Sequence, residues 1–99
     1  MSLMSTHELY KTDGWKLISV ASACSVQVRG GPANSSWAEY CGHVRIFVGD
    51  NQPTEEDVPY FELEQGEFFS KATAAQNLYM RIGARHTEGP IYITLMEYY

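Results

Sequence analysis

Hydrophobic and polar residues alternate along several stretches of the chain, with the period of two that places successive side chains on opposite faces of a β-strand. The clearest stretches are residues 25–29, 43–48 and 91–98, and weaker ones are residues 15–20, 58–63 and 67–71. Because each strand has an apolar face, the strands are expected to share one core. The residues predicted to face it are Val26, Val28, Val44, Ile46, Val48, Leu78, Met80, Ile82, Ile91, Ile93 and Leu95.

Glycine and proline separate most of these stretches, at residues 30–32, 49–53, 64–66 and 89–90. Short strands between such turns predict an all-β fold, either an antiparallel β-sandwich or a small barrel, of about six to eight strands. A chain of 99 residues is expected to be a single domain over residues 1–99. Residues 1–3 are interpreted as a cloning remnant that precedes a native start at Met4.

Residues 71–84 fit two patterns. Ala75, Leu78, Tyr79 and Ile82 form a stripe with helical spacing, whereas residues 78–82 also alternate as in a strand. A loop to about Gln76 followed by a strand is preferred, because both neighbouring segments are predicted strands. A helix over residues 71–78 stays open as the alternative.

The charge balance excludes some classes of function. The formal net charge is −5 and the basic residues are scattered, so a nucleic-acid partner is not expected. No apolar run approaches the ~20 residues of a membrane helix, so no membrane partner is expected either. The N-terminus is interrupted by polar and charged residues and does not resemble a secretory signal.

Seven of the twelve carboxylates lie within residues 48–67. A calcium loop would draw its ligands from residues 50–51 and 55–57, but their spacing does not match the helix–loop–helix calcium motif. Glu62 and Glu64 alternate with Phe61 and Leu63, as on the polar face of a strand. The cluster is therefore interpreted as a solvated turn between strands, without structural calcium.

The two cysteines, Cys24 and Cys41, are predicted to be unbridged thiols. A zinc site would need both of them with His43 and one more ligand, and close ligand pairs of the usual spacing are absent. No nucleophile or phosphate-binding motif occurs. We therefore expect a non-enzymatic protein without metal or other cofactor.

The aromatic residues exceed what a small core can bury. Tyr92, Met96 and Tyr98 lie opposite the predicted core face of the last strand, and Tyr99 follows them. These four residues are the predicted interface, because an exposed apolar stripe marks a contact surface. The last strand is expected to be a sheet edge that pairs with another copy in a homo-oligomer.

The alternative is a carbohydrate- or receptor-binding module. It would use Trp37 and Tyr40 as a recognition loop beside the acidic residues, with a surface glycan as its partner. A flat stripe favours assembly, whereas a concave aromatic rim beside carboxylates favours sugar binding.

The order of the turn and strand motifs over residues 24–98 resembles that of small β-structured virion proteins of tailed bacteriophages and prophages. The polar segment from Gly30 to Trp37 departs from that pattern. The resemblance implies a structural component of the head, neck, tail or fibre, which assembles as a trimer or ring with other virion proteins. It also implies a location in the virion after synthesis in the bacterial host cytoplasm. The matching residues are Gly49, Asp50, Pro53, Thr54, Leu63, Gly66, Glu67, Tyr79, Arg81, Gly83, Thr94 and Glu97.

Overall fold

The computed structural model describes residues 2–30, 43–54, 58–64, 66–72, 76–83 and 90–98. These residues form eight strands and one short 3-10 helix, η1. In chain order the elements are β1 (Ser2–Leu9), η1 (Lys11–Asp13), β2 (Lys16–Ser19), β3 (Ala23–Gly30), β4 (His43–Gly49), β5 (Phe61–Glu64), β6 (Phe68–Lys71), β7 (Asn77–Ile82) and β8 (Ile91–Tyr98).

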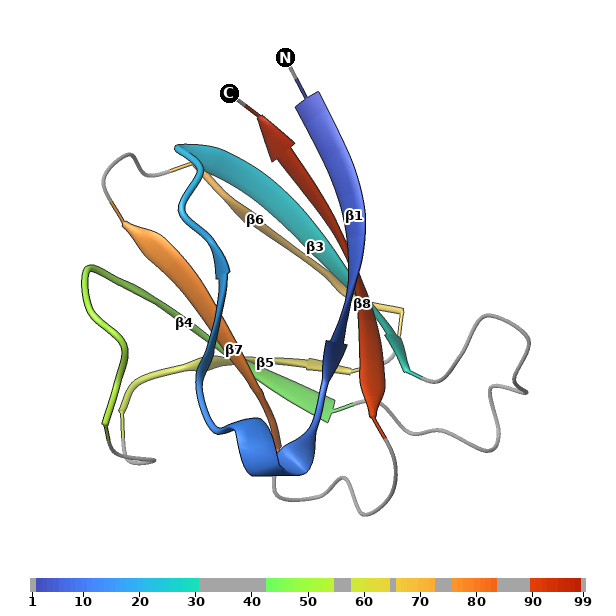
Figure 1. Cartoon of the computed structure of the whole chain (residues 1–99), viewed down its shortest axis with the longest axis vertical. Coiled ribbons are helices and arrows are strands. Elements are labelled where there is room, and N and C mark those ends of the chain that lie inside the picture. The colour runs from blue at the N-terminus through green and yellow to red at the C-terminus, as the bar shows by residue number, and fades with distance from the viewer. Residues whose placement is uncertain are drawn as a thin grey trace.

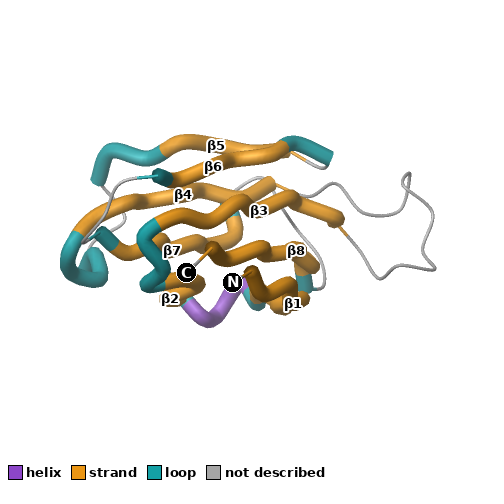
Figure 2. The backbone as a smooth tube through the Cα atoms, turned by 90° about the horizontal axis from the view of Figure 1, so that it is seen from above, coloured by secondary structure: helices purple, strands orange, loops and turns teal. Residues whose placement is uncertain are grey.

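The strands form two four-stranded antiparallel sheets that pack face to face. Sheet A has the order β1-β8-β3-β6, and sheet B has the order β2-β7-β4-β5. Figure 2 shows β1 and β2 at one edge of the sandwich and β5 and β6 at the other. The predicted antiparallel β-sandwich is confirmed.

The pairing follows a simple rule along the chain. β1 pairs with β8, β2 with β7, β3 with β6 and β4 with β5, as in one long hairpin whose two arms wind together. Further pairing of β3 with β8 and of β4 with β7 joins these pairs into the two sheets. Figure 1 shows the result, in which the two ends of the chain lie side by side. Eight strands wound in this way form a double-sheet jelly roll.

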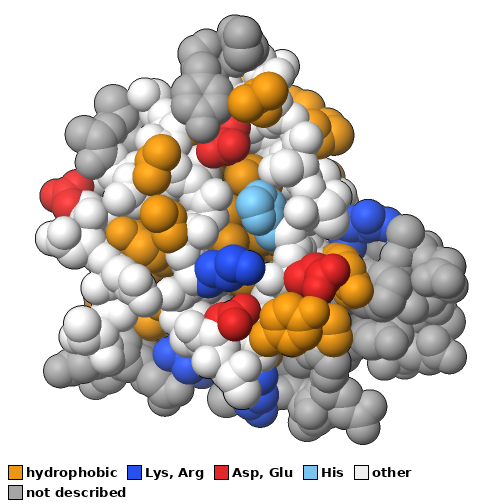
Figure 3. All heavy atoms as spheres, viewed as in Figure 1, with side chains coloured by type: hydrophobic (Ala, Val, Ile, Leu, Met, Phe, Trp, Pro, Cys, Tyr) orange, Lys and Arg blue, Asp and Glu red, His pale blue; other side chains and the backbone are white. Residues whose placement is uncertain are grey.

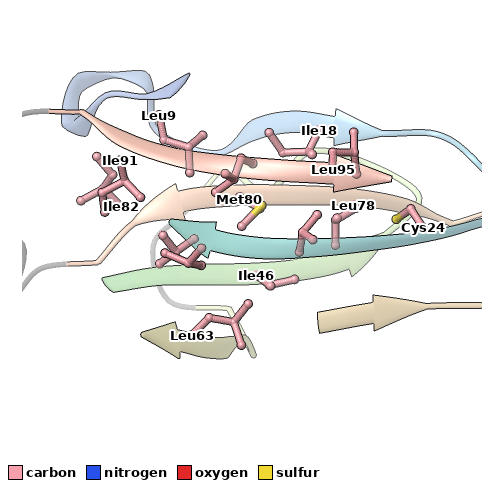
Figure 4. Close-up of a cluster of buried hydrophobic side chains, with 14 residues drawn as sticks. Leu9, Ile18, Cys24, Ile46, Leu63, Leu78, Met80, Ile82, Ile91 and Leu95 are labelled. Carbon is pink, nitrogen blue, oxygen red and sulfur yellow. The ribbon is translucent and has the colours of Figure 1, made fainter. Parts of the chain in front are cut away.

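Apolar side chains from both sheets fill the space between them (Figure 4). Ten of the eleven predicted core residues are buried, and the remaining one, Val48, packs against the core while partly exposed. Leu9, Ile18, Cys24 and Leu63 complete the cluster. Burial alternates along β3 and β8, which is the reason that the period of two is so clear in these strands.

Of the two patterns in residues 71–84, the structure shows the strand. β7 begins at Asn77, so Leu78 belongs to a strand, whereas residues 73–75 lie outside the described residues. Leu78, Met80 and Ile82 face the core and Tyr79 and Arg81 lie on the other side of the sheet. β7 pairs with β2 on one side and β4 on the other, which explains why this segment forms a strand and not a helix.

The prediction of an edge position for the last strand is wrong. β8 lies inside sheet A, where Met96 is opposite Met4 on one side and Ser25 on the other. Its backbone is therefore bonded on both sides. The covering strand is β1, which the alternation does not predict because Leu9 is its one buried residue. Ser2 and Leu3, two of the residues interpreted as a remnant, extend β1 opposite Tyr98 and Glu97.

No helix in the described ranges is long and apolar enough to cross a membrane.

Candidate interaction surface

The outer face of sheet A carries the predicted interface residues. Ile91, Ile93 and Leu95 of β8 point into the core, so Tyr92, Met96 and Tyr98 point away from it. Residues directly opposite each other in a sheet project to the same side. The register therefore places on this outer face, from the neighbouring strands, Met4, Thr6, Ser25, Gln27, Phe68 and Ser70.

Three large apolar side chains of this face are open to solvent. The exposed fractions are 66% for Met4, 70% for Phe68 and 45% for Tyr98. Met96 is half-buried between Met4 and Ser25, its partners on the two neighbouring strands. Behind it, the hydroxyl groups of Ser25 and Ser70 lie 3.0 Å apart and tie β3 to the edge strand β6.

These side chains surround a shallow groove of about 210 Å³, which we name the methionine groove. Its residues bear no charge, and Glu8 and Arg29 lie at the opposite end of sheet A. The charged groups of Lys71 and Glu97, at the groove end, are turned inward to Ala21 and Ser19. Thioethers adapt their shape to a partner, and an uncharged patch is cheap to desolvate. The groove is lined by Met4, Ser25, Val26, Gln27, Phe68, Thr94, Met96 and Tyr98.

Three of the four predicted interface residues lie on this outer face, and Tyr99 lies outside the described residues. Met96 and Tyr98 line the groove, whereas Tyr92 lies opposite Glu8 at the other end of β8. The alternation did not point to Met4 or Phe68. Met4 sits in a mostly polar strand, and Phe68 is one of two adjacent phenylalanines of which one faces the core. The proposed recognition residues Trp37 and Tyr40 also lie outside the described residues.

The outer face of sheet B is built differently, because its aromatic rings pack on one another. Trp15 and Phe47 meet edge to face with ring centres 6.0 Å apart, and Phe47 lies 6.3 Å from Tyr79. The guanidinium of Arg81 lies over the Trp15 ring at 5.7 Å. Trp15 is only 4% exposed and Tyr79 only 5%. The rings of this aromatic row are therefore largely engaged within the fold, although Leu17, opposite Tyr79 on the same face, is 47% exposed.

His43 belongs to a polar cluster on sheet B. Its Nε2 atom lies 3.0 Å from Glu62 Oε2, and Arg45 Nε lies 4.0 Å from Glu62 Oε1. The Arg45 guanidinium lies 4.6 Å from the centre of the Tyr60 ring. Glu62 thus sits on the polar strand face as predicted, and it contacts two basic side chains. The zinc option paired His43 with Cys41, which lies outside the described residues.

The His43 ring leaves room for nothing larger than glycine at position 83, directly after the end of β7. A Cβ atom on Gly83 would lie 2.0 Å from His43 Nδ1 and 2.7 Å from its Cε1 atom. The Gly83 amide also donates a hydrogen bond to the His43 carbonyl oxygen, at 2.8 Å. Gly83 is therefore explained by close packing within the fold.

A pocket of about 480 Å³ lies beside η1, at the Trp15 end of sheet B. Gln52 and Trp15 form part of its lining, and the Gln52 side-chain amide donates to the Trp15 carbonyl oxygen at 2.8 Å. Its remaining walls come from Asp13, Gly14, Pro53, Thr54 and Arg81. The pocket combines a carboxylate, an amide and a guanidinium group, which suits a polar ligand.

A polar cluster closes one end of the sandwich. Ser19 Oγ donates to Glu97 Oε2 at 2.6 Å, and Lys71 Nζ donates to the Ala21 carbonyl oxygen at 2.5 Å. Cys24 is a free cysteine buried beside them, and burial raises the pKa of its thiol, against the opposing effects of Ser19 and Lys71. A buried, protonated thiol is a poor nucleophile, so Cys24 serves as a small core residue.

The acidic segment is only partly described. The Asp50 carbonyl oxygen accepts a hydrogen bond from the Asn77 side chain at 3.3 Å, whereas residues 55–57 of the calcium option lie outside the described residues. In the ranges that are described, no three His, Cys, Asp or Glu side chains gather as they would around a metal ion.

Comparison with known protein families, with curated proteins and with solved structures gives no match for this chain.

Proposed function

We propose that the protein is a non-enzymatic assembly component that self-associates through the outer face of sheet A. The observation that carries the proposal is the methionine groove, in which Met4, Phe68 and Tyr98 are exposed around an uncharged surface. Exposed apolar surface of this kind marks a contact site in soluble proteins. Tyr, Phe and Met are also the residue types that are enriched in interface cores, from which charged residues are depleted.

Net charge restricts the surface that a second copy can use. Two copies of a chain with a formal charge of −5 repel each other at long range. They approach at the lowest electrostatic cost through a surface without charged side chains. The methionine groove is such a surface, whereas the outer face of sheet B presents Arg45, Glu62 and Arg81.

Fold analogy and resemblance extend the proposal to a class of particle. Jelly rolls occur in viral capsid proteins and in lectins, although a fold alone does not determine a function. The motifs of this chain resemble small virion proteins of tailed bacteriophages. We therefore propose a structural component of a phage virion, made in the bacterial host cytoplasm, that forms a trimer or ring and contacts other virion proteins.

The test is the native mass of a groove variant beside a matched control. Met4→Ser with Tyr98→Ser removes two exposed apolar groups from the groove, whereas Leu17→Ser with Val20→Ser removes two exposed apolar groups elsewhere. Light scattering over micromolar concentrations should show an oligomer for the unmodified chain and the control, and monomer for the groove variant. All three should retain a β-rich circular dichroism spectrum. A monomeric unmodified chain, or an unchanged mass for the groove variant, would contradict the proposal.

The second candidate is glycan binding, which the pocket beside η1 favours through Asp13, Gln52 and Arg81. Carboxylate, amide and guanidinium groups form the hydrogen bonds by which sugar hydroxyls are held. Titration of a labelled chain with simple sugars should then shift the NMR signals of these residues, and Asp13→Asn should abolish the shifts. Absence of shifts at millimolar sugar would remove this candidate.

A further inference from the structure

The strand β1 is an unusual edge strand. It runs from Ser2 to Leu9 and pairs with β8 at every position, without a bulge. It contains no proline or lysine, and its one acidic residue is Glu8. Proteins usually protect a sheet edge by shortness, bulges, prolines or charged side chains, because unpaired backbone groups recruit other strands. β1 has almost none of these protections.

The other three edges of the two described sheets are better protected. β2, β5 and β6 have four residues each, half the length of β1. The pairing of β2 also shifts register between Leu17 and Ser19. Even if residues 1–3 are a remnant, Met4–Leu9 still forms a regular strand opposite Ile91–Met96. A second copy therefore finds its longest regular backbone template at β1.

One end of β1 is already covered from within the molecule. Lys16 of β2 reaches across the sandwich, and its Nζ atom donates to the Glu8 carbonyl oxygen at 3.1 Å. The stretch from Ser2 to Thr6 is exposed throughout, with Leu3 and Met4 on opposite faces of the strand. Figure 3 views the molecule from the side on which β1 and β2 lie, and shows acidic, basic and hydrophobic side chains intermixed there.

We propose that two copies of the chain pair β1 with β1, antiparallel about a two-fold axis near Ser5. This rests on the proposed self-association and adds a second contact to it, because edge pairing at β1 leaves Phe68 and Tyr98 of the methionine groove open for the contact that builds a larger assembly. Such a pair is self-complementary and closed, because each copy offers this edge once. The pairing joins two copies of sheet A into one eight-stranded sheet, the order of strands in each copy being β1-β8-β3-β6.

Side-chain chemistry favours an axis near Ser5. With Ser5 opposite Ser5 of the second copy, Leu3 lies opposite His7, and Met4 lies opposite Thr6. Glu8 then lies opposite Ser2, so the two acidic groups stay apart. The exposed Leu3 and Met4 both gain a neighbour. Because Met4 lines the methionine groove, the two grooves come to lie side by side on one continuous face.

Disulfide trapping tests the axis. Met4, Ser5 and Thr6 are each replaced by cysteine in a chain carrying Cys41→Ser, and Ser70→Cys on the opposite edge of sheet A is the control. A cysteine crosslinks to its own copy only near the axis, since a disulfide needs Cβ atoms within about 4.5 Å. We expect severalfold faster covalent dimer formation at one or two adjacent β1 positions than at Ser70. Equal rates at all four positions would overturn the proposal.

Hydrogen exchange of the unmodified chain tests the same idea without substitutions. Edge pairing should slow the exchange of alternate β1 amides by more than about tenfold as the concentration rises through the association range. An oligomer whose β1 amides exchange at a concentration-independent rate would overturn the edge pairing and leave the assembly function standing. A chain that is monomeric at every concentration would overturn both.

Discussion

The two outer faces of the sandwich use aromatic residues in opposite ways. On sheet B, Trp15 and Tyr79 are nearly buried against Phe47, and Arg81 covers the Trp15 ring. On sheet A, Phe68 and Tyr98 stand open beside serine, threonine and methionine side chains. Both faces belong to sheets of four strands with the same antiparallel pairing. The difference therefore comes from the side chains that surround each ring.

This contrast separates aromatic residues that hold the fold from those that are available to a partner. A ring with a cation above it and another ring at its edge has already exchanged its hydration for internal contacts. An exposed ring has not, and removing it should cost the folded monomer little. The free energy of unfolding of single variants therefore tests the contrast between the two faces.

The largest effect is expected for Trp15→Ala. This substitution removes a buried ring together with its contacts to Phe47 and Arg81. The free energy of unfolding should fall by about 3–5 kcal/mol, as is usual when a buried Trp becomes Ala. Urea unfolding followed by circular dichroism measures it. A loss below about 1 kcal/mol would show that the sheet B row is not structural.

A somewhat smaller loss is expected for Gly83→Ala. The added methyl group would collide with the His43 ring, whose Nδ1 atom lies 2.0 Å from the new Cβ position. Forced overpacking of this kind costs about 1–3 kcal/mol. In a chain that already carries His43→Ala, the same Gly83→Ala change should cost much less. Strictly additive effects of the two substitutions would contradict the packing explanation.

The fold could be predicted from the sequence where burial alternates cleanly. β3, β4 and β8 have one apolar side that is buried almost throughout, so their pattern is clear, whereas the pattern of β7 also fitted a helical stripe. β1 could not be predicted, because an edge strand with both sides largely exposed has no hydrophobic period. The misplacement of β8 at an edge follows directly from that omission, since β1 is the strand that covers it.

The candidate surface could be predicted only in part. The alternation of β8 placed Tyr92, Met96 and Tyr98 on one outward face, and the structure places them there. Met4 and Phe68 come from strands distant in the chain, and only the register of sheet A brings them beside Met96 and Tyr98. Pairing between distant strands depends on the whole topology, which local periodicity does not contain.

The side chains of Cys24 and Ser25 lie on the inner and the outer side of β3, so they allow the two sides of sheet A to be compared. Cys24 is 2% exposed, and burial raises the pKa of its thiol. With Cys41→Ser present, Cys24 should react with a thiol reagent more than about tenfold slower than a cysteine introduced by Ser25→Cys. Equal labelling rates at neutral pH would show that the inner face of sheet A opens readily.

The same shift sets a pH dependence of stability. Because the folded state holds the Cys24 thiol at a raised pKa, the unfolded chain releases this proton first as the pH rises. Below the thiol pKa of the unfolded chain, about 8.5, Cys24 makes its full contribution to stability. Above that pH, the free energy of unfolding should decline. Urea unfolding at several pH values measures the decline. Cys24→Ala should flatten it, and an identical slope in that variant would contradict the assignment to Cys24.

The smallest effect is expected for Phe68→Ser, and the neighbouring Phe69 provides its control. Phe68 is exposed on the outer face of sheet A, whereas Phe69 packs against the core and lies 5.3 Å from the Phe61 ring. At concentrations low enough for monomer, Phe68→Ser should change the free energy of unfolding by no more than about 0.5 kcal/mol. Phe69→Ser should cost more than about 2 kcal/mol.

At concentrations that favour association, the melting temperature of the Phe68→Ser variant provides a second test. An oligomer stabilises the folded state by mass action, so the unmodified chain should melt at a higher temperature as its concentration rises. Phe68→Ser should lose most of that increase, because the ring belongs to the methionine groove. A melting temperature that rises equally for both chains would mean that association uses another surface. A monomer destabilised as strongly by Phe68→Ser as by Phe69→Ser would mean that the outer face of sheet A, like that of sheet B, mainly holds the fold.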